Sequence, residues 1–467
     1  MANADATPLK DRLWSRLVER VILPLGDYVY GQRMMRRLSF LRRAQWWTPG
    51  QLEDYRDNRL AALMRIAWDE VPFYRQWMAR AGVRPEDIRT ARDLQKLPVV
   101  TKAMLRPAYP DQTTRNTGQP DFEVCSSGST GNPFRVREDA DTAGQYRAVF
   151  LLMLEWSGWR IGLPHVQTGI TPDRSGPKQI KDLLLRCRYI PAFDLTDPHL
   201  DTVLDFMDSH HIRFLWGYPG SLYSLARRAA HRGWNQPLKS VAAWGDNLYA
   251  HYRRTIEQVF KTKVYNQYGC GEGVEISAQC AHGDWLHVFD TDVIVEYLDE
   301  QASPVPPGRT GNIVVTRLHP GPMPLIRYQV GDVGASGGDR RCECGRGLSV
   351  MESIQGRDTD IVFTPGGNRL IVHFFTGILE FFPQVDLFQV VQQDVHSIDL
   401  RIVPHPDFTD ALKQRIINRL KQAGADLDIR IQLVDAIPTT ANGKRRFVIN
   451  KMQNPNTDLP QEPSLDI

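Results

Sequence analysis

The sequence lacks several features that mark specialised classes of protein. Across its 467 residues, no apolar run approaches the roughly 20 residues that a membrane-spanning helix needs. The formal net charge is only +3, which argues against a nucleic-acid-binding protein. Arg16, Glu19 and Arg20 interrupt the first apolar stretch, so we expect no signal peptide and a cytoplasmic protein.

Cysteine is scarce, at six residues in the chain. Disulfides are uncommon in cytoplasmic proteins of this size, and Cys342 and Cys344 stand too close together for a comfortable bridge. Together with Cys280 and His287 they form a Cys₃His set, whose composition suits structural zinc. His282 competes for the fourth ligand position, and free buried cysteines are the alternative to a metal site.

The composition is otherwise that of an ordinary globular protein, with 42% hydrophobic and 24% charged residues, and the length favours two or three domains. Residues 9–82 are expected to be mostly helical, because apolar side chains recur at helical spacing before Pro72 breaks the pattern. Residues 33–47 combine arginines with aromatic side chains. We interpret them as a surface helix with a solvated charged face, with a helix lying on a membrane surface as the alternative.

Short apolar strands alternate with helices from residue 97 to about residue 350, which predicts an α/β fold with mixed sheets. After residue 356 the pattern changes to strand, helix and strand, which predicts a small α+β domain. The expected strands include residues 213–216, 240–244, 263–265, 312–316, 388–391, 398–403 and 429–434. The expected helices include residues 148–156, 250–260 and 410–423, the first of them buried.

The sharpest local motif is a loop of small and hydroxyl-bearing residues. Backbone N–H groups in such a loop can turn inward around phosphate oxygens, and the hydroxyl groups add donors. The loop has no Gly-Lys-Ser/Thr ending, so it is not a Walker loop, and on its own it is more often a flexible turn. Its residues are Ser126, Ser127, Gly128, Ser129, Thr130, Gly131, Asn132 and Pro133.

This loop resembles the phosphate loop of the adenylate-forming superfamily, which includes acyl-CoA synthetases, peptide-synthetase adenylation domains and luciferases. Four further segments follow in the order of that family. Residues 268–272 resemble its adenine and magnesium motif, residues 328–332 its ribose motif, residues 356–360 its hinge motif and residues 438–444 its C-terminal lysine motif. Each match is weak alone, but five in order over more than 300 residues form a strong signal.

A closer resemblance is to the phenylacetate–CoA ligase branch, and within it to the capsule-biosynthesis-type ligases. Residues 71–75 and 97–102 look like N-terminal signatures of that branch, and residues 342–346 look like its paired cysteines, which belong to a zinc site in related ligases. The resemblance covers nearly the whole chain. It implies an ATP- and acid-binding domain over residues 1–355 and a small mobile lid domain over residues 356–467.

The resemblance also assigns roles to individual residues. Lys444, Glu272 and Thr130 are expected to be catalytic, with Glu272 as the Mg²⁺ ligand and Lys444 as the cation that touches both the carboxylate and the α-phosphate. The nucleotide-contacting positions are Ser126, Ser127, Gly128, Ser129, Thr130, Gly131, Gly245, Asp246, Tyr268, Gly269, Asp332 and Arg357. The acid-contacting positions are Trp216, Tyr218, Trp244, Cys270 and Gly271.

The chain departs from the family pattern in three places, one of which is Gln329-Val330 where the ribose motif more commonly has Arg-Thr. Thr359 replaces the first of two adjacent acidic residues at the hinge, and only Asp360 remains. Trp244, Gly245 and Asp246 stand where the family usually has Gly-Glu, so we expect an altered contact with adenine.

The function implied is ATP-dependent conversion of a small carboxylic acid, weakly suggested to be aromatic or bulky, to its acyl-AMP. Pyrophosphate is released, and the acyl group then passes to coenzyme A. An amine, a hydroxyl or a carrier-protein thiol are the alternative acceptors. A catalytically inactive, zinc-stapled nucleotide-binding scaffold is the alternative of a different class. The presence of Thr130, Glu272, Asp332 and Lys444 argues against it.

Overall fold

The computed structural model divides the chain into two compact units. The first holds residues 1–248, 255–330 and 334–354, and the second holds residues 249–254, 331–333 and 355–467. Within them the structure describes residues 8–126, 134–169, 176–191, 197–245, 247–357, 361–366, 369–371, 375, 378–379, 381–382, 384–438 and 446–452.

The first unit opens with the helical region that the sequence predicts. Its helices are α1 (Leu9–Leu17), a π-helical turn (Val18–Ile22), α2 (Leu23–Tyr30), α3 (Met34–Ala44), α4 (Pro49–Glu70) and α5 (Pro72–Arg80). Thr48 caps α4: its hydroxyl accepts a hydrogen bond from the Gln51 backbone, and the Gln51 side chain accepts one from the Thr48 backbone. Pro72 ends one helix and starts the next, because proline is tolerated in the first turn of a helix.

Helix α3 carries the arginine-rich segment, and its apolar side is packed inward. Leu38 and Leu41 are buried in the first unit. Arg37 pairs with Asp292 at 2.7 Å, and Arg42 pairs with Glu19 and Glu155. This agrees with a helix on the protein surface, although part of its charged face is satisfied by the protein rather than by solvent.

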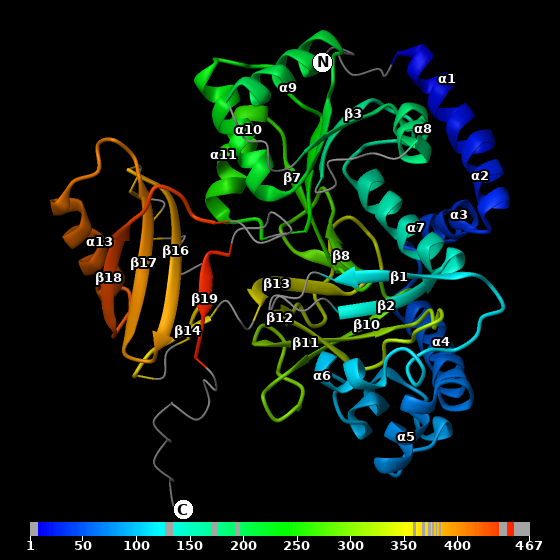
Figure 1. Ribbon diagram of the computed structural model, residues 1–467. Helices are drawn as coiled ribbons and strands as arrows, with labels where there is room; N and C mark the ends of the chain where they lie inside the picture. The colour runs from blue at the N-terminus through cyan, green and yellow to red at the C-terminus, as the bar shows by residue number, and fades with distance from the viewer. Residues whose placement is uncertain are drawn as a thin grey trace, which may run out of the picture. The chain divides into compact units, whose positions relative to one another are not determined.

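An eleven-stranded mixed sheet organises the first unit (Figure 1). In spatial order its strands are β10 (Val293–Leu298), β11 (Thr310–Arg317), β12 (Tyr328–Ser336), β13 (Val350–Arg357), β9 (Leu286–Val288), β8 (Val274–Gln279), β7 (Val264–Cys270), β6 (Ser240–Ala243), β5 (Phe214–Gly217), β3 (His165–Gly169) and β4 (Cys187–Pro191). Strands β7, β6, β5, β3 and β4 run parallel, whereas β8 pairs antiparallel with β7. The predicted α/β architecture with a mixed sheet is confirmed.

Several helices connect or flank these strands. One of them is the mostly buried helix α7 (Ala140–Trp156), which contains the predicted buried segment. Asp139 caps this helix, because its carboxylate accepts a hydrogen bond from the Thr142 backbone at 2.8 Å. The others are α6 (Lys102–Leu105), α8 (Gly176–Leu185), α9 (Asp197–Ser209), α10 (Pro219–His231), α11 (Ala250–Phe260) and the 3₁₀ turns Pro85–Asp87, Ala91–Lys96 and Arg106–Ala108.

A separate hairpin brackets the predicted phosphate loop. Strands β1 (Asp121–Ser126) and β2 (Phe134–Asp139) pair antiparallel, with Ser126 opposite Phe134. Residues 127–133 therefore connect two strands whose ends are fixed against each other.

The second unit is a small α+β assembly, as predicted. Its four-stranded sheet has the order β18 (Asp428–Leu433), β17 (Ser397–Pro404), β16 (Val385–Asp394) and β19 (Val448–Asn450). A two-stranded sheet of β14 (Ile361–Phe363) and β15 (Arg369–Ile371) and the amphipathic helix α13 (Asp410–Gln422) complete its described elements.

Candidate active site

Three of the predicted site segments lie at one edge of the parallel part of the sheet. Strands β5, β6 and β7 are neighbours in the sheet, and Tyr218, Trp244 and Glu272 all follow the carboxyl ends of these strands. In open α/β sheets, ligands bind outside the carboxyl ends of the strands. The fold thus brings together residues that are more than 50 positions apart in the sequence.

Glu272 stands at the tip of the turn between β7 and β8 and is almost fully buried, at 2% exposure. Lys102 Nζ lies 2.8 Å from its Oε1 atom, and the Tyr328 hydroxyl donates a hydrogen bond to the same oxygen at 2.9 Å. Burial by itself raises the pKa of Glu272, but the Lys102 charge and the hydrogen bonds from Lys102 and Tyr328 outweigh it and hold that pKa below its usual range. Glu272 is therefore a buried carboxylate that is ionised at neutral pH.

The surroundings of Glu272 include Phe134, the first residue of strand β2. The rings of Phe134 and Tyr328 stack with their centroids 5.9 Å apart, and Lys102 Nζ lies 5.9 Å from the centroid of Phe134. Phe134 is the first described residue after the predicted phosphate loop. The ionised carboxylate and a lysine thus lie beside the strand into which this loop leads.

Lys102 is a site residue that sequence reasoning did not single out. It appeared only as the last residue of a family signature, with no role attached. The two partners, Lys102 and Glu272, are far apart in the sequence, and neither local spacing nor residue type indicates that they pair. A lysine at the start of a short helix after an apolar strand-like segment was the only available signal.

Three of the predicted acid-contacting residues are aromatic: Trp216, Tyr218 and Trp244. Trp216 is buried, stacks on His165 with ring centroids 3.8 Å apart, and lies 6.4 Å from the ring of Trp244. Gly245 has a positive φ of 77°, and a Cβ at this position would meet the Tyr218 ring at 2.6 Å. Glycine is thus required beside Tyr218 for both its backbone conformation and the space it leaves.

The other predicted residues of the nucleotide motif have mixed environments. Tyr268 is buried in the apolar core, Cys270 is half-buried beside that core, and Gly271 is exposed. A Cβ on Gly269 would meet the Val274 carbonyl oxygen and the Glu275 carboxylate, each at 2.7 Å. This glycine therefore permits the tight pairing of β7 with β8.

Asp332 is half-buried on β12, and Arg357 is the last residue of β13. The remaining predicted residues lie outside the described residues. These are Ser127, Gly128, Ser129, Thr130, Gly131, Asp246 and Lys444, together with Thr359 and Asp360 of the hinge segment. The side chains of Ser126 and Arg357 also lie outside the description.

The four predicted zinc ligands meet in the first unit. The ligand atoms of Cys280, His287, Cys342 and Cys344 all lie within 4.8 Å of one another. The Cys280 and Cys342 sulfurs are 3.6 Å apart, and Cys344 Sγ lies 3.3 Å from His287 Nε2. Four ligands at zinc-bonding distances of about 2.1–2.3 Å in a tetrahedron are roughly 3.4–3.8 Å apart, which is close to these two separations.

The charge state of the cluster also fits a cation. Burial raises the pKa of the Cys280 thiol to about 12, so a thiolate there needs a positive charge beside it. Burial, with the nearby Arg346 charge, lowers the pKa of His287 to about 4, which leaves a neutral imidazole able to bind a metal. His282, the rival ligand, places its backbone carbonyl near the cysteines instead, so the geometry favours His287.

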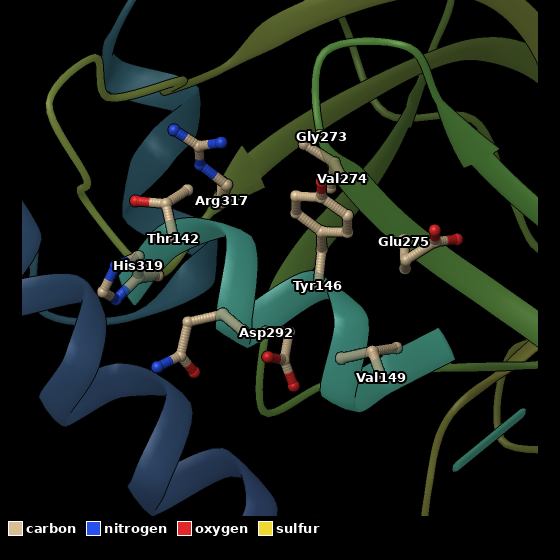
Figure 2. Close-up of a pocket in the computed structure, with 10 residues that line it drawn as sticks. Thr142, Tyr146, Val149, Gly273, Val274, Glu275, Asp292, Arg317 and His319 are labelled. Carbon is tan, nitrogen blue, oxygen red and sulfur yellow. The ribbon is translucent and has the colours of Figure 1, made fainter. Parts of the chain in front are cut away.

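A pocket lined partly by ionisable residues includes Gly273, which follows Glu272 in the turn between β7 and β8 (Figure 2). Figure 2 shows Tyr146 standing up from α7 towards Gly273 and Val274, with Arg317 and His319 on the side of Thr142. Burial raises the pKa of Glu275 in this pocket to about 7 and lowers that of His319 to about 3.

Glu138 supports the pocket from β2. Its Oε1 atom lies 3.9 Å from Nη1 of the buried Arg317, and neither atom has a hydrogen-bond partner in the described parts of the chain. Burial raises the pKa of Glu138, while Arg317 and Arg147 oppose that shift. Neither residue was singled out from the sequence. Because side chains alternate along a strand, Glu138 shares a face with the buried Phe134 and Val136. Arg317 likewise shares a face with the buried Ile313 and Val315.

The chain is similar to known proteins over most of its length. Residues 362–451 match the family model described as the CapK C-terminal domain. The chain is 25% identical to a phenylacetate–coenzyme A ligase of Thermus thermophilus, over 86% of this chain and 96% of that protein. It is 23% identical to protein CapK of Staphylococcus aureus, over 82% of this chain and 85% of that protein. The crystal structure of a 2-hydroxyisobutyryl-CoA ligase in its postadenylation state superposes with a TM-score of 0.72 at 20% identity, over 89% of this chain and 92% of that one, and shares its fold.

Proposed function

We propose that this chain, an adenylate-forming and phenylacetate–CoA ligase-like protein, converts a carboxylic acid to its acyl-AMP and then transfers the acyl group to the thiol of coenzyme A. The similarity of the chain to a phenylacetate–coenzyme A ligase over 86% of its length supports this proposal, and its fold is that of an acyl-CoA ligase. The observation that carries the proposal is Glu272, an ionised carboxylate buried beside Lys102 at the carboxyl edge of the sheet.

In the first step, an oxygen of the substrate carboxylate attacks the α-phosphorus of ATP. A new bond forms between this oxygen and the α-phosphorus. The bond from that phosphorus to the oxygen between the α- and β-phosphates breaks, and pyrophosphate leaves. Both reactants are anions, so the site must neutralise charge and hold the groups in line. Lys444 is proposed to supply the mobile positive charge, and the loop of residues 126–131 to hold phosphate oxygens with Thr130.

Glu272 is proposed to hold the Mg²⁺ that accompanies ATP, because magnesium takes few carboxylates together with phosphate oxygens and water. The residue fits this role in being ionised. Its Oε1 atom already accepts contacts from Lys102 and Tyr328, which hold the carboxylate in one orientation. The ion would lower the negative charge that the attacking carboxylate meets.

In the second step, the thiol sulfur attacks the acyl carbon, a thioester forms and AMP leaves. Lys444 would occupy the space needed by the incoming thiol if it stayed beside the α-phosphate. The small unit is therefore proposed to rotate between the steps at residues 356–360, through a few backbone torsions. Asp332 is proposed to bind ribose hydroxyls, and the aromatic group around Trp216 and Trp244 to line the acid site.

The cysteine–histidine cluster is proposed to hold one structural zinc ion. Four protein ligands complete a tetrahedral site and leave no open position for substrate. Its role is therefore to fix the segment that carries Cys342 and Cys344 against strands β8 and β9.

A panel of carboxylic acids, scored by pyrophosphate release with and without coenzyme A, tests the proposal. An acid that releases pyrophosphate and yields a thioester only with coenzyme A supports it. An acyl product that forms only with an added amine, alcohol or carrier protein assigns one of the other acceptors. If ATP binds but no acid in a broad panel releases pyrophosphate, the nucleotide-binding scaffold replaces the ligase.

A further inference from the structure

The first helices of the chain present an apolar stripe to the outside. Its members recur at every fourth position through α1, the π-helical turn and α2. They are Leu9, Leu13, Leu17, Val21, Leu25 and Val29. All six are between 44% and 67% exposed. At the end of α2, Tyr28 is 87% exposed and Tyr30 is 67% exposed. Surface helices of globular proteins normally turn such a stripe towards the core.

The inward side of the same segment is partly polar. Asp11 and Ser15 are buried, and Asp11 pairs with Arg186 at 2.6 Å. Trp14 Nε1 donates a hydrogen bond to the Leu184 carbonyl at 3.1 Å. The segment is therefore anchored to the protein through these contacts and through Val18, which leaves the six stripe residues outside.

The π-helical turn (Val18–Ile22) helps to keep the stripe on one side. A step of four residues advances a side chain by about 40° around an α-helix, so a long stripe with this spacing would spiral away. In a π-helix the same step falls short of a full turn, which rotates the side chains back. The turn lies in the middle of the stripe.

Positive charge runs alongside the stripe. Arg12, Arg16 and Arg20 each follow a stripe leucine by three residues, which makes them its neighbours on the helix surface, and all three are exposed. Each acidic residue between positions 8 and 30 already has a partner. Asp11 forms a salt bridge with Arg186, Glu19 forms one with Arg42, and Asp27 accepts a hydrogen bond from the Met35 backbone. Within residues 8–30, the exposed side is thus apolar and basic.

Helix α8, next to α1, also has exposed apolar side chains. The contact of Trp14 with Leu184 places α8 beside α1, and the two helices lie at one edge of the first unit (Figure 1). Ile180 and Leu183 on α8 are 60% and 76% exposed.

We propose that the stripe and its arginines are a docking surface for an anionic lipid bilayer. A helix with apolar and basic sides lies in the membrane interface, with its leucines at the acyl boundary and its arginines at the headgroup phosphates. Tyrosines such as Tyr28 and Tyr30 favour the same interface. No described helix is long and apolar enough to cross a membrane, so the contact is in the plane of the bilayer.

A second copy of this chain fits the surface less well. Two identical faces in contact would bring Arg12, Arg16 and Arg20 of each copy into one interface, with no exposed acidic residue of residues 8–30 to pair with them. Like charges placed together across an interface weaken it. An anionic bilayer neutralises the same arginines.

Vesicle sedimentation of the full chain tests the proposal. Vesicles of phosphatidylcholine with phosphatidylglycerol should carry the protein down at low salt, and vesicles of phosphatidylcholine alone should carry down far less. The triple variant R12Q/R16Q/R20Q should bind the anionic vesicles on the order of 100-fold more weakly, because each basic residue near such a surface contributes about 1 kcal/mol. The double variant L13Q/L17Q should also lose roughly tenfold or more.

The control is R65Q/R80Q/R92Q, which removes the same charge from exposed positions on other helices and turns. It should bind vesicles as the parent protein does, and all variants should keep their melting temperature and pyrophosphate release. Absence of parent binding to anionic vesicles overturns the proposal, as does equal loss in the control. If L13Q/L17Q instead converts a dimer to a monomer in light scattering, the stripe is an interface between copies.

Discussion

At the scale of single residues, the site depends on how a buried carboxylate stays charged. Glu272 is 2% exposed, and its ionised form is favoured by the contacts that Lys102 and Tyr328 make with one oxygen. A buried charge that loses its partner is costly and takes up a proton instead. The charge on Lys102 is therefore a condition for the proposed binding of Mg²⁺ by Glu272.

Lys102→Met should move the acidic limb of the activity profile to higher pH. With Lys102 present, the pKa of Glu272 is lowered; without it, burial dominates and the pKa rises. If the pKa of Glu272 rises above about 6, activity near pH 6 should fall roughly tenfold for each further unit of that rise. Activity should recover at higher pH, where Glu272 is ionised again. The measurement is kcat/KM for pyrophosphate release against pH.

Two variants complete this test. Lys102→Arg should restore most of the activity, because it keeps the charge. Lys96→Met removes a lysine that pairs with Asp93 on the surface, and it should leave the profile unchanged. A uniform loss at every pH in Lys102→Met would contradict a role through the charge of Glu272.

Glu275 is expected to make stability depend on pH. Burial raises its pKa in the folded protein to about 7, above the value of about 4.3 for an unfolded chain. Between those values the folded state binds more protons than the unfolded state, so this residue's contribution to the free energy of unfolding falls as pH rises from about 4.5 to 7.

Glu275→Gln removes the titration. Relative to the parent protein, the variant should gain stability at pH 8, where the parent has a buried charge, and gain little at pH 5. Urea unfolding at both pH values measures the difference. An equal change at the two pH values would contradict the assignment.

At the scale of elements, the turn between β7 and β8 holds Glu272 through a glycine. Gly273 has a φ of +74°, and a Cβ there would lie 1.8 Å from Glu138 Oε1. Gly273→Ala should lower the free energy of unfolding by about 1–2 kcal/mol for the left-handed backbone, and by more for the close contact with Glu138. It should also reduce pyrophosphate release, because the neighbouring Glu272 shifts.

Gly82→Ala is the matched control. Gly82 has a similar φ of +68°, and a Cβ there meets nothing within 4 Å. Gly82→Ala should lower the free energy of unfolding only by the amount that the left-handed backbone conformation costs, and it should keep its activity. If both variants lose the same stability and both stay active, the contact with Glu138 does not constrain the turn.

The cysteine cluster ties the strands β8 and β9 to the segment before β13. We expect metal analysis of protein purified without chelators to find about one zinc per chain. Cys342→Ser should lower zinc content and melting temperature, and change kcat by less than about twofold, because a four-ligand site has no catalytic position. Cys187→Ser, a half-buried cysteine elsewhere, should keep the metal. Metal-free parent protein would exclude a zinc site.

The sequence predicted elements better than contacts between them. Helix α11 (Ala250–Phe260) was expected at its observed bounds, and each expected strand overlaps an observed strand. These elements could be predicted because hydrophobic periodicity and helix-breaking residues are local signals. The meeting of Cys280 with Cys342 could be anticipated because thiols in a Cys-x-Cys spacing indicate a metal.

The partners of Glu272 and the apolar stripe could not be predicted. Lys102 and Glu272 meet only through the tertiary fold. The spacing of Leu13 and Leu17 indicates an amphipathic helix, but periodicity does not state which side faces the core. From the sequence, a membrane-surface helix was considered only for residues 33–47, as the alternative to a solvated surface helix. The exposed apolar side belongs instead to the helices before that segment.

At the scale of the whole molecule, the proposed chemistry is divided between the two units. The first contains the carboxyl edge of the sheet with Glu272 and the proposed zinc ligands, and the second contains the segment with Lys444. If Lys444 acts only in the first step, its loss should stop adenylation without weakening ATP binding, because the phosphate loop, Glu272 and Asp332 remain.

The most direct test of the central claim is acid-dependent exchange of radioactive pyrophosphate into ATP by Lys444→Ala, with Lys451→Ala as the control. Lys451 is an exposed lysine shortly after the motif in the same unit. We expect exchange to fall by at least roughly a thousandfold in Lys444→Ala, at unchanged ATP affinity, and to be normal in Lys451→Ala. Exchange by Lys444→Ala at near the parent rate would contradict the mechanism.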